Sequence, residues 1–542
     1  MIRSNTKMQK RCHWKHLTVL TLTVNFCLAT AVVRSQTKRI ENVLLIVTDD
    51  QSVHLECYGT RGISTPATSR LAQEGTLFQN AYATCASCSP ARSSILTGMY
   101  PHSNGHWRNT HAPSLSAPKK DFGPNSRYRD IEKVGVHEDI PTLIELLNRA
   151  GFVTGVTQKF HLSPPWKYPF DHRYSANNHP DSHKFATEAF LEASGNKPFF
   201  LMANIGNTHR PFSKHIVDIA VPRVDPNQIE VPANLPDTPM LRRDMAEYLD
   251  TVQCADACAG AILDALRTSG RLDQTVIIFT SDQGYCYHRA KATAYDLGVH
   301  VPLIIAGPGI TRGLTGDELV SHVDLVPTIL DLLGLSTPDT VQGMSLRPLL
   351  EGRNSPQWRT VVFSEHNSHG PNPNEYYPIR GAFDGRFHYL RNLNMQRRWT
   401  GDPDSLLASG FNTNDIGFAG PADAFPGGPW GNHSYEATVL AKEMFPIQYD
   451  LLSATFKRPA EELYDHHHDP YEIRNLADDP RYSIHLERLR TRLNDWMRQT
   501  DDPGKNLRDV PRRSNGAALS SMQFQRCQTA ISEQFHTNRS DL

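Results

Sequence analysis

The chain has 542 residues, of which 39% are hydrophobic and 21% are charged, a balance typical of a soluble globular protein. Its 56 Lys and Arg residues nearly equal its 57 Asp and Glu residues, so a broad basic surface is excluded and nucleic acid is not expected as a partner. Large α/β domains often exceed the common size of about 150 residues, so we expect two domains in a chain of this length.

The first 35 residues have the pattern of a secretory signal peptide. An apolar run from Leu17 to Val33 ends near the small-residue sequence Ala29-Thr30-Ala31, as is usual near a cleavage site. The alternative is a membrane anchor, but several threonines make the run too polar for a stable span. We therefore predict export, with no membrane span in the mature chain. The destination would be the periplasm or the outside of a bacterium, or the lysosome of an animal cell. The run follows five basic residues, Arg3, Lys7, Lys10, Arg11 and Lys15.

The chain contains nine cysteines, of which Cys12 and Cys27 would leave with the signal peptide. The remaining ones are too few to form a disulfide scaffold at this length, although export permits disulfides. Because their number is odd, at least one of these thiols has no cysteine within the chain with which to form a disulfide. Cys88 is our candidate for that residue.

From residue 42 onward, short apolar runs alternate with amphipathic helices. The alternation predicts a large, mostly parallel sheet covered by helices on both faces, in a domain of residues 36–355. Strands are predicted at residues 42–48, 152–157 and 275–280. Helices are predicted from Thr65-Pro66 to Gly75, at residues 143–150 and at residues 243–268.

The pattern changes after about residue 356, where shorter strands and turns predict a smaller antiparallel sheet with a closing helix. This second domain would cover residues 356–510 and be followed by a tail, residues 511–542. Residues 401–430 are rich in Gly, Pro, Asp and Asn and predict a long surface loop. The predicted fold class is therefore α/β, a large mostly parallel sheet between helices with a smaller C-terminal antiparallel sheet domain. The strands and closing helix of this part are predicted at residues 361–363, 379–393, 462–464 and 484–497.

Two pairs of oxygen-bearing residues follow two predicted strands directly. Asp49-Asp50 comes after the strand at residues 42–48, and Asp282-Gln283 comes after the strand at residues 275–280. Ligands of open α/β sheets bind at the carboxyl ends of the strands, and oxygen ligands suit a hard cation such as Ca2+ or Mg2+. Each pair taken alone also fits a helix cap or a turn.

A second motif is Cys88-Ser89-Pro90-Ala91-Arg92. Pro90 at the first helical position would place Cys88 at a helix N-terminus, where free amide groups favour an anion and lower the pKa of a thiol. The alternatives are a redox or metal pair with Cys85, or a simple buried cysteine. A redox pair is expected near a thioredoxin-like βαβ start, and a zinc site needs more ligands at suitable spacing.

The motif Cys88-x-Pro90-x-Arg92, followed by Leu96-Thr97-Gly98, resembles the signature of the type I sulfatases, in which this cysteine is converted to formylglycine (3-oxoalanine). The resemblance runs from about residue 42 to residue 477 and implies an alkaline phosphatase-like fold. Within the family the chain is similar to the heparan N-sulfatases, also called sulfamidases. The stretches that carry this narrower similarity are Lys159-Phe160-His161, Tyr168-Pro169-Phe170-Asp171, His209-Arg210, Arg391-Asn392-Leu393-Asn394 and residues 462–480.

The resemblance implies a metal site that holds one Ca2+ per chain, completed by an oxygen of the modified Cys88. Gln283 departs from the more usual Asn or His, and its carbonyl oxygen lies one methylene further out. A formylglycine-generating enzyme would be needed as a maturation partner. The implied protein ligands are Asp49, Asp50, Asp282 and Gln283.

The resemblance also implies the groups that act on the substrate. Arg92 would hold the ionised diol of the hydrated aldehyde, while Lys159 and Lys291 would pair with sulfate oxygens. We expect His161 to deprotonate the second hydroxyl and His209, which also binds substrate, to protonate the leaving atom. The substrate implied is a sulfated saccharide, in particular the N-sulfate of glucosamine in heparin or heparan sulfate.

Three alternatives stay open from the sequence. An O-sulfatase would share the same core, and loops such as residues 365–377 and 401–430 would separate the two activities. A phosphoryl or phosphonate hydrolase would hold transition metals with more His ligands, and a non-catalytic glycan binder would not need a modifiable cysteine. The tract His466-His467-His468 resembles a metal-binding tract, but it precedes Asp469-Pro470 in a predicted turn and we expect it to be exposed. The oligomeric state also stays open, with a homodimer as one option.

Overall fold

The computed structural model describes residues 40–110, 134–353, 355–370, 376–395, 403–408 and 433–513. The predicted signal peptide lies outside the described residues, as does the predicted tail from residue 514 onward. No helix within the described ranges is both long enough and apolar enough to cross a bilayer.

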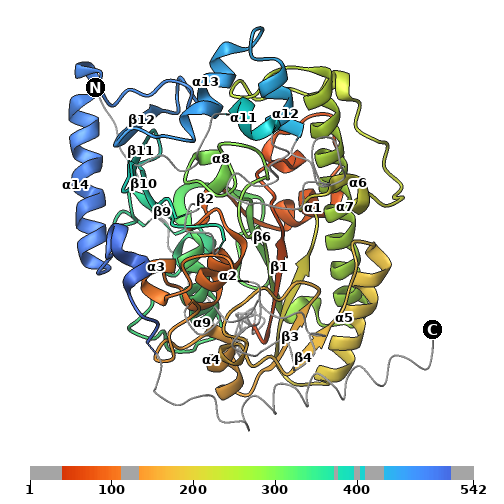
Figure 1. Ribbon diagram of the computed structural model, residues 1–542. Coiled ribbons are helices and arrows are strands. Elements are labelled where there is room, and N and C mark those ends of the chain that lie inside the picture. Colours follow the sequence, from red (N-terminus) through yellow and green to blue (C-terminus); the bar gives the residue numbers. More distant parts are fainter. Residues whose placement is uncertain are drawn as a thin grey trace, which may run out of the picture. The chain divides into compact units, whose positions relative to one another are not determined.

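An eight-stranded sheet forms the centre of the fold, with strand order β4-β3-β5-β1-β6-β7-β2-β8 (Figure 1). All neighbouring pairs are parallel except those of β7, which runs antiparallel to both β6 and β2. The strands are β1 (Asn42–Thr48), β2 (Gly75–Tyr82), β3 (Val153–Thr157), β4 (His172–Tyr174), β5 (Phe199–Ile205), β6 (Thr275–Ser281), β7 (Leu303–Ala306) and β8 (Leu314–Ser321).

Helices cover both faces of this sheet, which explains why its central strands are continuous apolar runs rather than alternating ones. Leu44 and Ile46 of β1 belong to a core shared with α1, α5 and α7, whereas Val43 and Leu45 belong to a core shared with α2, α4 and α9. The helices around the sheet are α1 (Pro66–Glu74), α2 (Cys88–Thr97), α3 (Pro101–Asn104), α4 (Leu143–Arg149), α5 (Pro180–Ser194), α6 (Phe212–His215), α7 (Pro239–Thr268), α8 (Asp296–Val299), α9 (Leu325–Leu332) and α10 (Arg347–Leu350).

A second sheet is antiparallel, with strand order β12-β11-β10-β9. Helix α14 lies along it (Figure 1) and buries the apolar side chains Leu489, Leu493 and Trp496, whose spacing of three and four residues places them on one helix face. The elements of this part are β9 (Val362–His366), β10 (Ile379–Phe383), β11 (Phe387–Asn392), α11 (Pro403–Ala408), α12 (His433–Leu440), α13 (Pro446–Ala454), β12 (Glu461–Asp465) and α14 (Ser483–Gln499).

The predicted fold class is confirmed, with two differences in detail. Helix α7 begins at Pro239, four residues before the predicted start, because Thr238 caps it by accepting a hydrogen bond from the backbone N–H of Leu241 at 3.2 Å. The stretch predicted as a loop at residues 401–430 contains helix α11, and its residues 409–430 lie outside the described residues. The division into domains at residues 355 and 356 stays a prediction.

Candidate active site

The predicted site residues gather at the carboxyl ends of four neighbouring strands, in the sheet order β3-β5-β1-β6. They lie just after β1, β3, β5 and β6 and at the start of α2, and Lys291 lies between β6 and α8. This is the edge at which open α/β sheets bind their ligands. We use the name polar cluster for Asp49, Asp50, Cys88, Arg92, Lys159, His209, Asp282, Gln283 and Lys291.

The three carboxylates of the polar cluster converge because of strand register. Thr48 of β1 pairs with Ser281 of β6, so the two chains leave the sheet at the same level. The backbone N–H of Asp50 donates to Asp282 Oδ1 at 3.1 Å. Asp50 has a φ of 61°, a left-handed conformation that Asp tolerates better than most residues. The Thr208 hydroxyl holds this turn by donating to the carbonyl oxygens of Asp49 and Asp50, at 3.2 and 2.7 Å.

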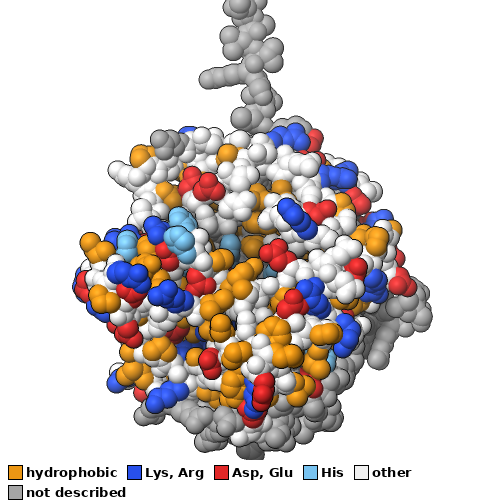
Figure 2. Space-filling model, turned by 90° about the horizontal axis from the view of Figure 1, so that it is seen from above, with side chains coloured by type: hydrophobic (Ala, Val, Ile, Leu, Met, Phe, Trp, Pro, Cys, Tyr) orange, Lys and Arg blue, Asp and Glu red, His pale blue; other side chains and the backbone are white. Residues whose placement is uncertain are grey.

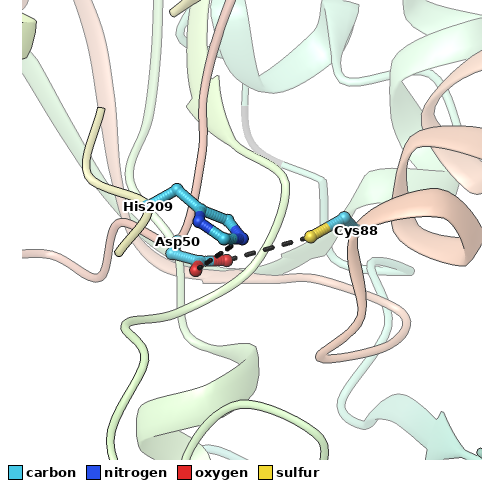
Figure 3. Close-up of side chains that lie close together, drawn as sticks. All are labelled: Asp50, Cys88 and His209. Carbon is cyan, nitrogen blue, oxygen red and sulfur yellow. Dashed lines mark hydrogen bonds and ion pairs between the residues drawn. The ribbon is translucent and has the colours of Figure 1, made fainter. Parts of the chain in front are cut away.

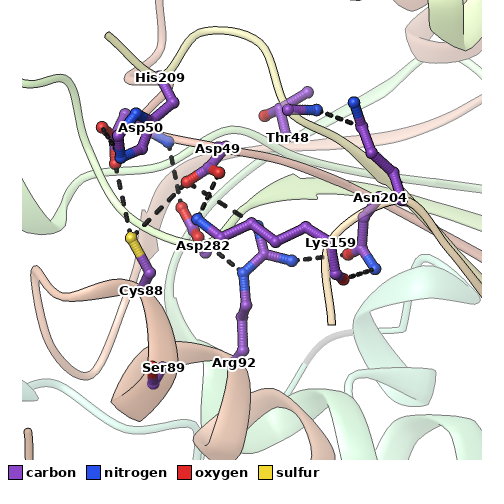
Figure 4. A network of polar contacts seen from close by, with 12 residues as sticks. Thr48, Asp49, Asp50, Cys88, Ser89, Arg92, Lys159, Asn204, His209 and Asp282 are labelled. Carbon is purple, nitrogen blue, oxygen red and sulfur yellow. Dashed lines mark hydrogen bonds and ion pairs between the residues drawn. The ribbon is translucent and has the colours of Figure 1, made fainter. Parts of the chain in front are cut away.

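Cys88 is the first residue of α2, and its side chain points at the carboxylates. Its Sγ lies 3.9 Å from Asp50 Oδ1 (Figure 3) and 3.7 Å from Asp49 Oδ1 (Figure 4). Pro90 is the third helical residue rather than the first, so this part of the prediction is corrected. The expected lowering of the thiol pKa is also wrong. Burial raises the pKa of Cys88 to about 12, and the nearby charge of Lys159 lowers it only in part.

Three cations face the three carboxylates one to one, and Figure 4 shows the pairs of Lys159 with Asp49 and of Arg92 with Asp282. Lys159 Nζ donates to Asp49; Lys291 Nζ donates to Asp50 Oδ2 at 2.8 Å; Arg92 Nε donates to Asp282 Oδ2 at 2.8 Å. Within each pair the positive charge compensates the negative one, which buried charges require.

The carboxyl groups of Asp49 and Asp282 differ in pKa. Burial by itself would raise the pKa of Asp49, but Lys159 and other nearby cations outweigh it and hold that pKa well below its ordinary value. Burial raises the pKa of Asp282 to about 6 against the opposing charge of Arg92, and the neighbouring Asp49 carboxylate contributes to the rise. The polar cluster is therefore highly charged and closely balanced near neutral pH.

His209 lies at the edge of the polar cluster with one ring nitrogen facing inward. Its Nδ1 lies 2.6 Å from the carbonyl oxygen of Arg210, which can only accept a hydrogen bond, so Nδ1 carries the proton of the neutral ring. Its Nε2 lies 3.3 Å from Lys291 Nζ and 3.8 Å from Asp50 Oδ2. The side chain is about one-third exposed, so Nε2 can exchange protons with a ligand.

His161 is half-buried next to the polar cluster in a left-handed conformation, with a φ of 37°, and its Nδ1 atom is buried. Burial, together with the charges of Lys159 and Arg92, holds its pKa well below the ordinary value, so the ring is neutral. Its Nδ1 has no hydrogen-bond partner among the described residues. The interactions that relate His161 to the polar cluster are thus electrostatic ones with Arg92, Lys159 and Asp49.

The sequence analysis missed Asn204, which joins three parts of the site. Its Oδ1 accepts from Arg92 Nη1 at 2.7 Å, and its Nδ2 donates to the carbonyl oxygens of Lys159 at 2.6 Å and Thr157 at 3.1 Å. It is fully buried within the otherwise apolar strand β5. An asparagine in such a run was the available signal, because a buried amide needs polar partners. Thr208, which holds the backbone of Asp49 and Asp50, was not predicted either, because it belongs to no sequence motif.

The donor set of the polar cluster fits a hard cation. Ligand atoms of Asp49, Cys88 and Asp282 lie within 4.8 Å of one another, and so do those of Asp50, Cys88 and His209. Gln283 Oε1 is buried without a hydrogen-bond partner among the described residues. A buried orphan carbonyl oxygen beside three carboxylates is a set that Ca2+ takes readily. The amide nitrogen of Gln283 donates to Asp50 and, at 3.4 Å, to Cys88 Sγ.

Cys57, Cys85, Cys88, Cys254 and Cys258 form no disulfide. Cys85 therefore forms no disulfide with Cys88, and Cys254 and Cys258 pack as buried thiols in α7. Cys85 Sγ lies 3.8 Å from His366 Nδ1.

The site contains carboxylates that could bind a cation, cations that could bind an anion and imidazoles that could transfer protons. These are the groups that a hydrolase of an anionic substrate group needs. Comparisons with known proteins agree. The family model described as "Sulfatase" matches residues 41–335, and the model described as "N-sulphoglucosamine sulphohydrolase, C-terminal" matches residues 285–400.

Two human relatives match most of the chain. The human N-sulphoglucosamine sulphohydrolase is 30% identical over 86% of this chain and 91% of its own length. The human N-acetylglucosamine-6-sulfatase is 26% identical over 65% of this chain and 72% of its own length. Among solved structures, a phosphonate monoester hydrolase from Silicibacter pomeroyi matches with a TM-score of 0.59 and 20% identity. The match covers 85% of this chain and 96% of the hydrolase. That last likeness concerns the fold alone.

The chain belongs to the sulfatase family, and it is an enzyme of that family with marked similarity to the heparan N-sulfatases.

Proposed function

We propose that the protein is an exported, calcium-dependent sulfatase that removes the N-sulfate of glucosamine in heparin or heparan sulfate, with a formylglycine made from Cys88. The observation that carries this proposal is the position of Cys88 at the start of α2, within 4 Å of Asp49 and Asp50. The 30% identity to N-sulphoglucosamine sulphohydrolase over most of both chains supports the choice of substrate.

Asp49, Asp50, Asp282 and Gln283 would hold the calcium ion. A bound Ca2+ compensates negative charge and orients oxygen atoms around it. The carboxylates now paired with lysines would then have a second source of positive charge. Lys159 and Lys291 would become available to pair with the oxygens of a sulfate group, where each contact is a charge-assisted hydrogen bond.

Arg92 is suited to holding the nucleophile. Its Nη2 is buried, lies 4.0 Å from Asp49 Oδ1 and has no hydrogen-bond partner among the described residues. A buried guanidinium nitrogen without a partner is costly unless a ligand satisfies it. We assign it to an oxygen of the modified Cys88 side chain.

The formylglycine supplies, as a hydrated aldehyde, one hydroxyl that can attack sulfur and a second whose deprotonation releases sulfate. His161, whose ring is neutral, would accept the proton of the second hydroxyl. His209, when protonated on both ring nitrogens, would donate the proton of Nε2, which faces the polar cluster, to the leaving nitrogen and keep the proton on Nδ1. The sum of these steps consumes one water and yields a free amine and inorganic sulfate.

The test uses protein whose Cys88 peptide is shown by mass spectrometry to carry the aldehyde. Free amine and free sulfate are measured with N-sulfoglucosamine and with O-sulfated N-acetylglucosamine, and Cys88→Ala serves as the matched control. Release from the first sugar alone supports the proposal. Release from the second sugar alone would move the substrate to a sulfate ester, an alternative favoured by the relative that is an N-acetylglucosamine-6-sulfatase. No release from either would refute both.

Two parts of the proposal have separate tests. Elemental analysis of purified protein is expected to give calcium that is lost in Asp49→Asn, whereas zinc or manganese at that site would favour a phosphoryl-transfer enzyme. N-terminal sequencing of the secreted protein is expected to begin near residue 36. Retention of residues 1–35 would contradict a cleaved signal peptide.

A further inference from the structure

The histidine tract after β12 does not lie in solvent as a whole. The His468 side chain is 76% exposed, in agreement with the prediction, but the His466 side chain is only 12% exposed. The expectation of full exposure is therefore wrong for His466. Its ring packs against Phe383 and lies edge-on to the ring of His388.

Three ligand-type side chains meet where His466 is buried. His466 Nε2 lies 3.1 Å from Glu472 Oε1, and His388 Nδ1 contacts the same carboxylate oxygen. The ligand atoms of the three residues lie within 4.8 Å of one another. His388 comes from β11, whereas His466 and Glu472 come from the segment after β12. Two separate parts of the chain therefore supply the three side chains.

Outer contacts orient these side chains. The other oxygen of Glu472, Oε2, accepts from the backbone N–H of Asp296 at 3.0 Å. Asp296 Oδ1 lies 3.9 Å from His466 Nδ1, is buried and has no hydrogen-bond partner among the described residues. Histidine ligands of metals regularly direct their second ring nitrogen at a carboxylate, and that contact fixes the ring and its tautomer. Asp296 Oδ1, at 3.9 Å, lies beyond hydrogen-bond distance and would take this role after a small movement toward His466 Nδ1.

We propose that His388, His466 and Glu472 form a second metal site, distinct from the polar cluster, and that this site takes Zn2+. Two imidazole nitrogens and one carboxylate oxygen are a donor set that zinc binds, whereas calcium requires oxygen ligands. Asp296 acts as the positioning residue for His466.

The bound ion would have a structural effect beyond its own ligands. Asp296 begins α8, five residues after Lys291 of the polar cluster. Zinc would therefore connect β11 and the segment after β12 to the element that follows the proposed sulfate-binding lysine. A buried metal held by separate segments stabilises the folded chain, because the unfolded chain lacks the assembled site.

The test is a zinc titration of the full-length, calcium-saturated protein against a chromophoric chelator, with metal content measured after gel filtration. The expected stoichiometry is one zinc per chain. Losing even an outer contact commonly weakens metal binding about 10- to 100-fold, so His466→Ala is expected to weaken zinc binding at least about 100-fold. His468→Ala is the matched control from the same tract and is expected to bind zinc as the wild type does.

A Cys88→Ala variant separates this site from the polar cluster, because Cys88 belongs to both three-residue groups there. It is expected to keep its zinc. Replacement by Co2+ is expected to give a spectrum of nitrogen and oxygen ligands, and a thiolate charge-transfer band would instead place the ion at Cys88 and overturn the proposal. If His466→Ala does not fold, His466→Gln, which retains a hydrogen-bonding side chain, provides the comparison.

Two further outcomes would overturn the proposal. Equal zinc affinity of His466→Ala and His468→Ala would show that the ion binds elsewhere. Absence of bound zinc in the wild type at micromolar free zinc would show that His388, His466 and Glu472 form an ion-pair network only.

Discussion

Replacing Lys291 by Met tests the electrostatic role of the polar cluster most directly. The Lys291 side chain is 1% exposed, and its Nζ lies 2.8 Å from Asp50 Oδ2 and 3.3 Å from His209 Nε2. Methionine is close to lysine in length and keeps the apolar stem, so packing changes little while the charge and the donors are lost.

The expected loss of activity follows from the contact with the reacting group. Removing one preorganised donor to a developing charge typically lowers the rate by about 10²- to 10³-fold, or roughly 3–4 kcal/mol. We expect a fall of this size in kcat/KM for sulfate release, measured on protein with fully converted Cys88. Lys291→Arg, which keeps the charge but changes its geometry, is expected to lose less.

The expected loss of stability depends on calcium. Removing one partner of a buried ion pair costs about 3–5 kcal/mol, because the other charge stays buried without compensation. In calcium-free Lys291→Met protein, the buried Asp50 carboxylate would be left without a compensating charge. In calcium-loaded protein the ion would compensate Asp50, so the loss in the free energy of unfolding should be much smaller.

Thermal and urea unfolding with and without calcium measure this difference, and Lys457→Met, at an exposed position, is the control. A kcat/KM within threefold of the wild type would refute the contact between Lys291 and the sulfate group. Equal destabilisation with and without calcium would refute the placement of the ion beside Asp50.

Three further outcomes are expected. Cys88→Ala should abolish sulfate release and leave the circular dichroism spectrum unchanged, because it removes the nucleophile but little core volume; residual turnover above background would contradict the assigned role. Gln283→Leu should weaken calcium binding in titration calorimetry, since the buried carbonyl oxygen is lost, and unchanged affinity would remove Gln283 from the ligands. Asp502→Asn should destabilise the fold near neutral pH by about 2–3 kcal/mol, the size that a pKa shift of roughly two units implies. Burial would raise the pKa of Asp502, but the ion pair with Arg380 outweighs it and lowers that pKa to about 2. This stabilisation is present above the ordinary pKa of an aspartate and is lost as the pH falls through about 2, so wild type and Asp502→Asn should converge in acid; a difference that does not shrink would contradict the ion-pair account.

The large sheet was predictable because its strands are unusual in sequence. β1 and β6 are short apolar runs that acidic residues follow directly, and such runs are typical of a strand buried on both faces. The start of α7 carried the same Thr-Pro signal as the start of α1, yet the amphipathic pattern became regular only four residues later. Helix α11 was hidden because its surroundings have the composition of a loop.

The site was predictable to the extent that its residues follow strand ends or belong to a motif. Asp49, Asp50 and Asp282 meet because neighbouring parallel strands end at one edge, which the sequence pattern indicates. Asn204 and His466 could not be placed in this way, because their surroundings include residues more than 40 positions away in the chain, Lys159 for Asn204 and His388 for His466. The pKa of Cys88 was misjudged because a helix N-terminus is visible in the sequence, whereas the burial that outweighs it is not.

The charge balance of the polar cluster gives a physical reason for metal dependence. Its three carboxylates and three cations pair one to one, so the ion-free cluster has little net charge with which to attract an anion. On the face that Figure 2 shows, acidic and basic side chains lie interspersed, so that face presents no single-sign patch to attract an anion. A divalent cation among the carboxylates would leave the cluster with an excess of positive charge in a buried setting, where electrostatic interactions are strongest. The ion would therefore act before the substrate arrives, both by releasing the lysines from their carboxylates and by creating the field that a sulfate group responds to.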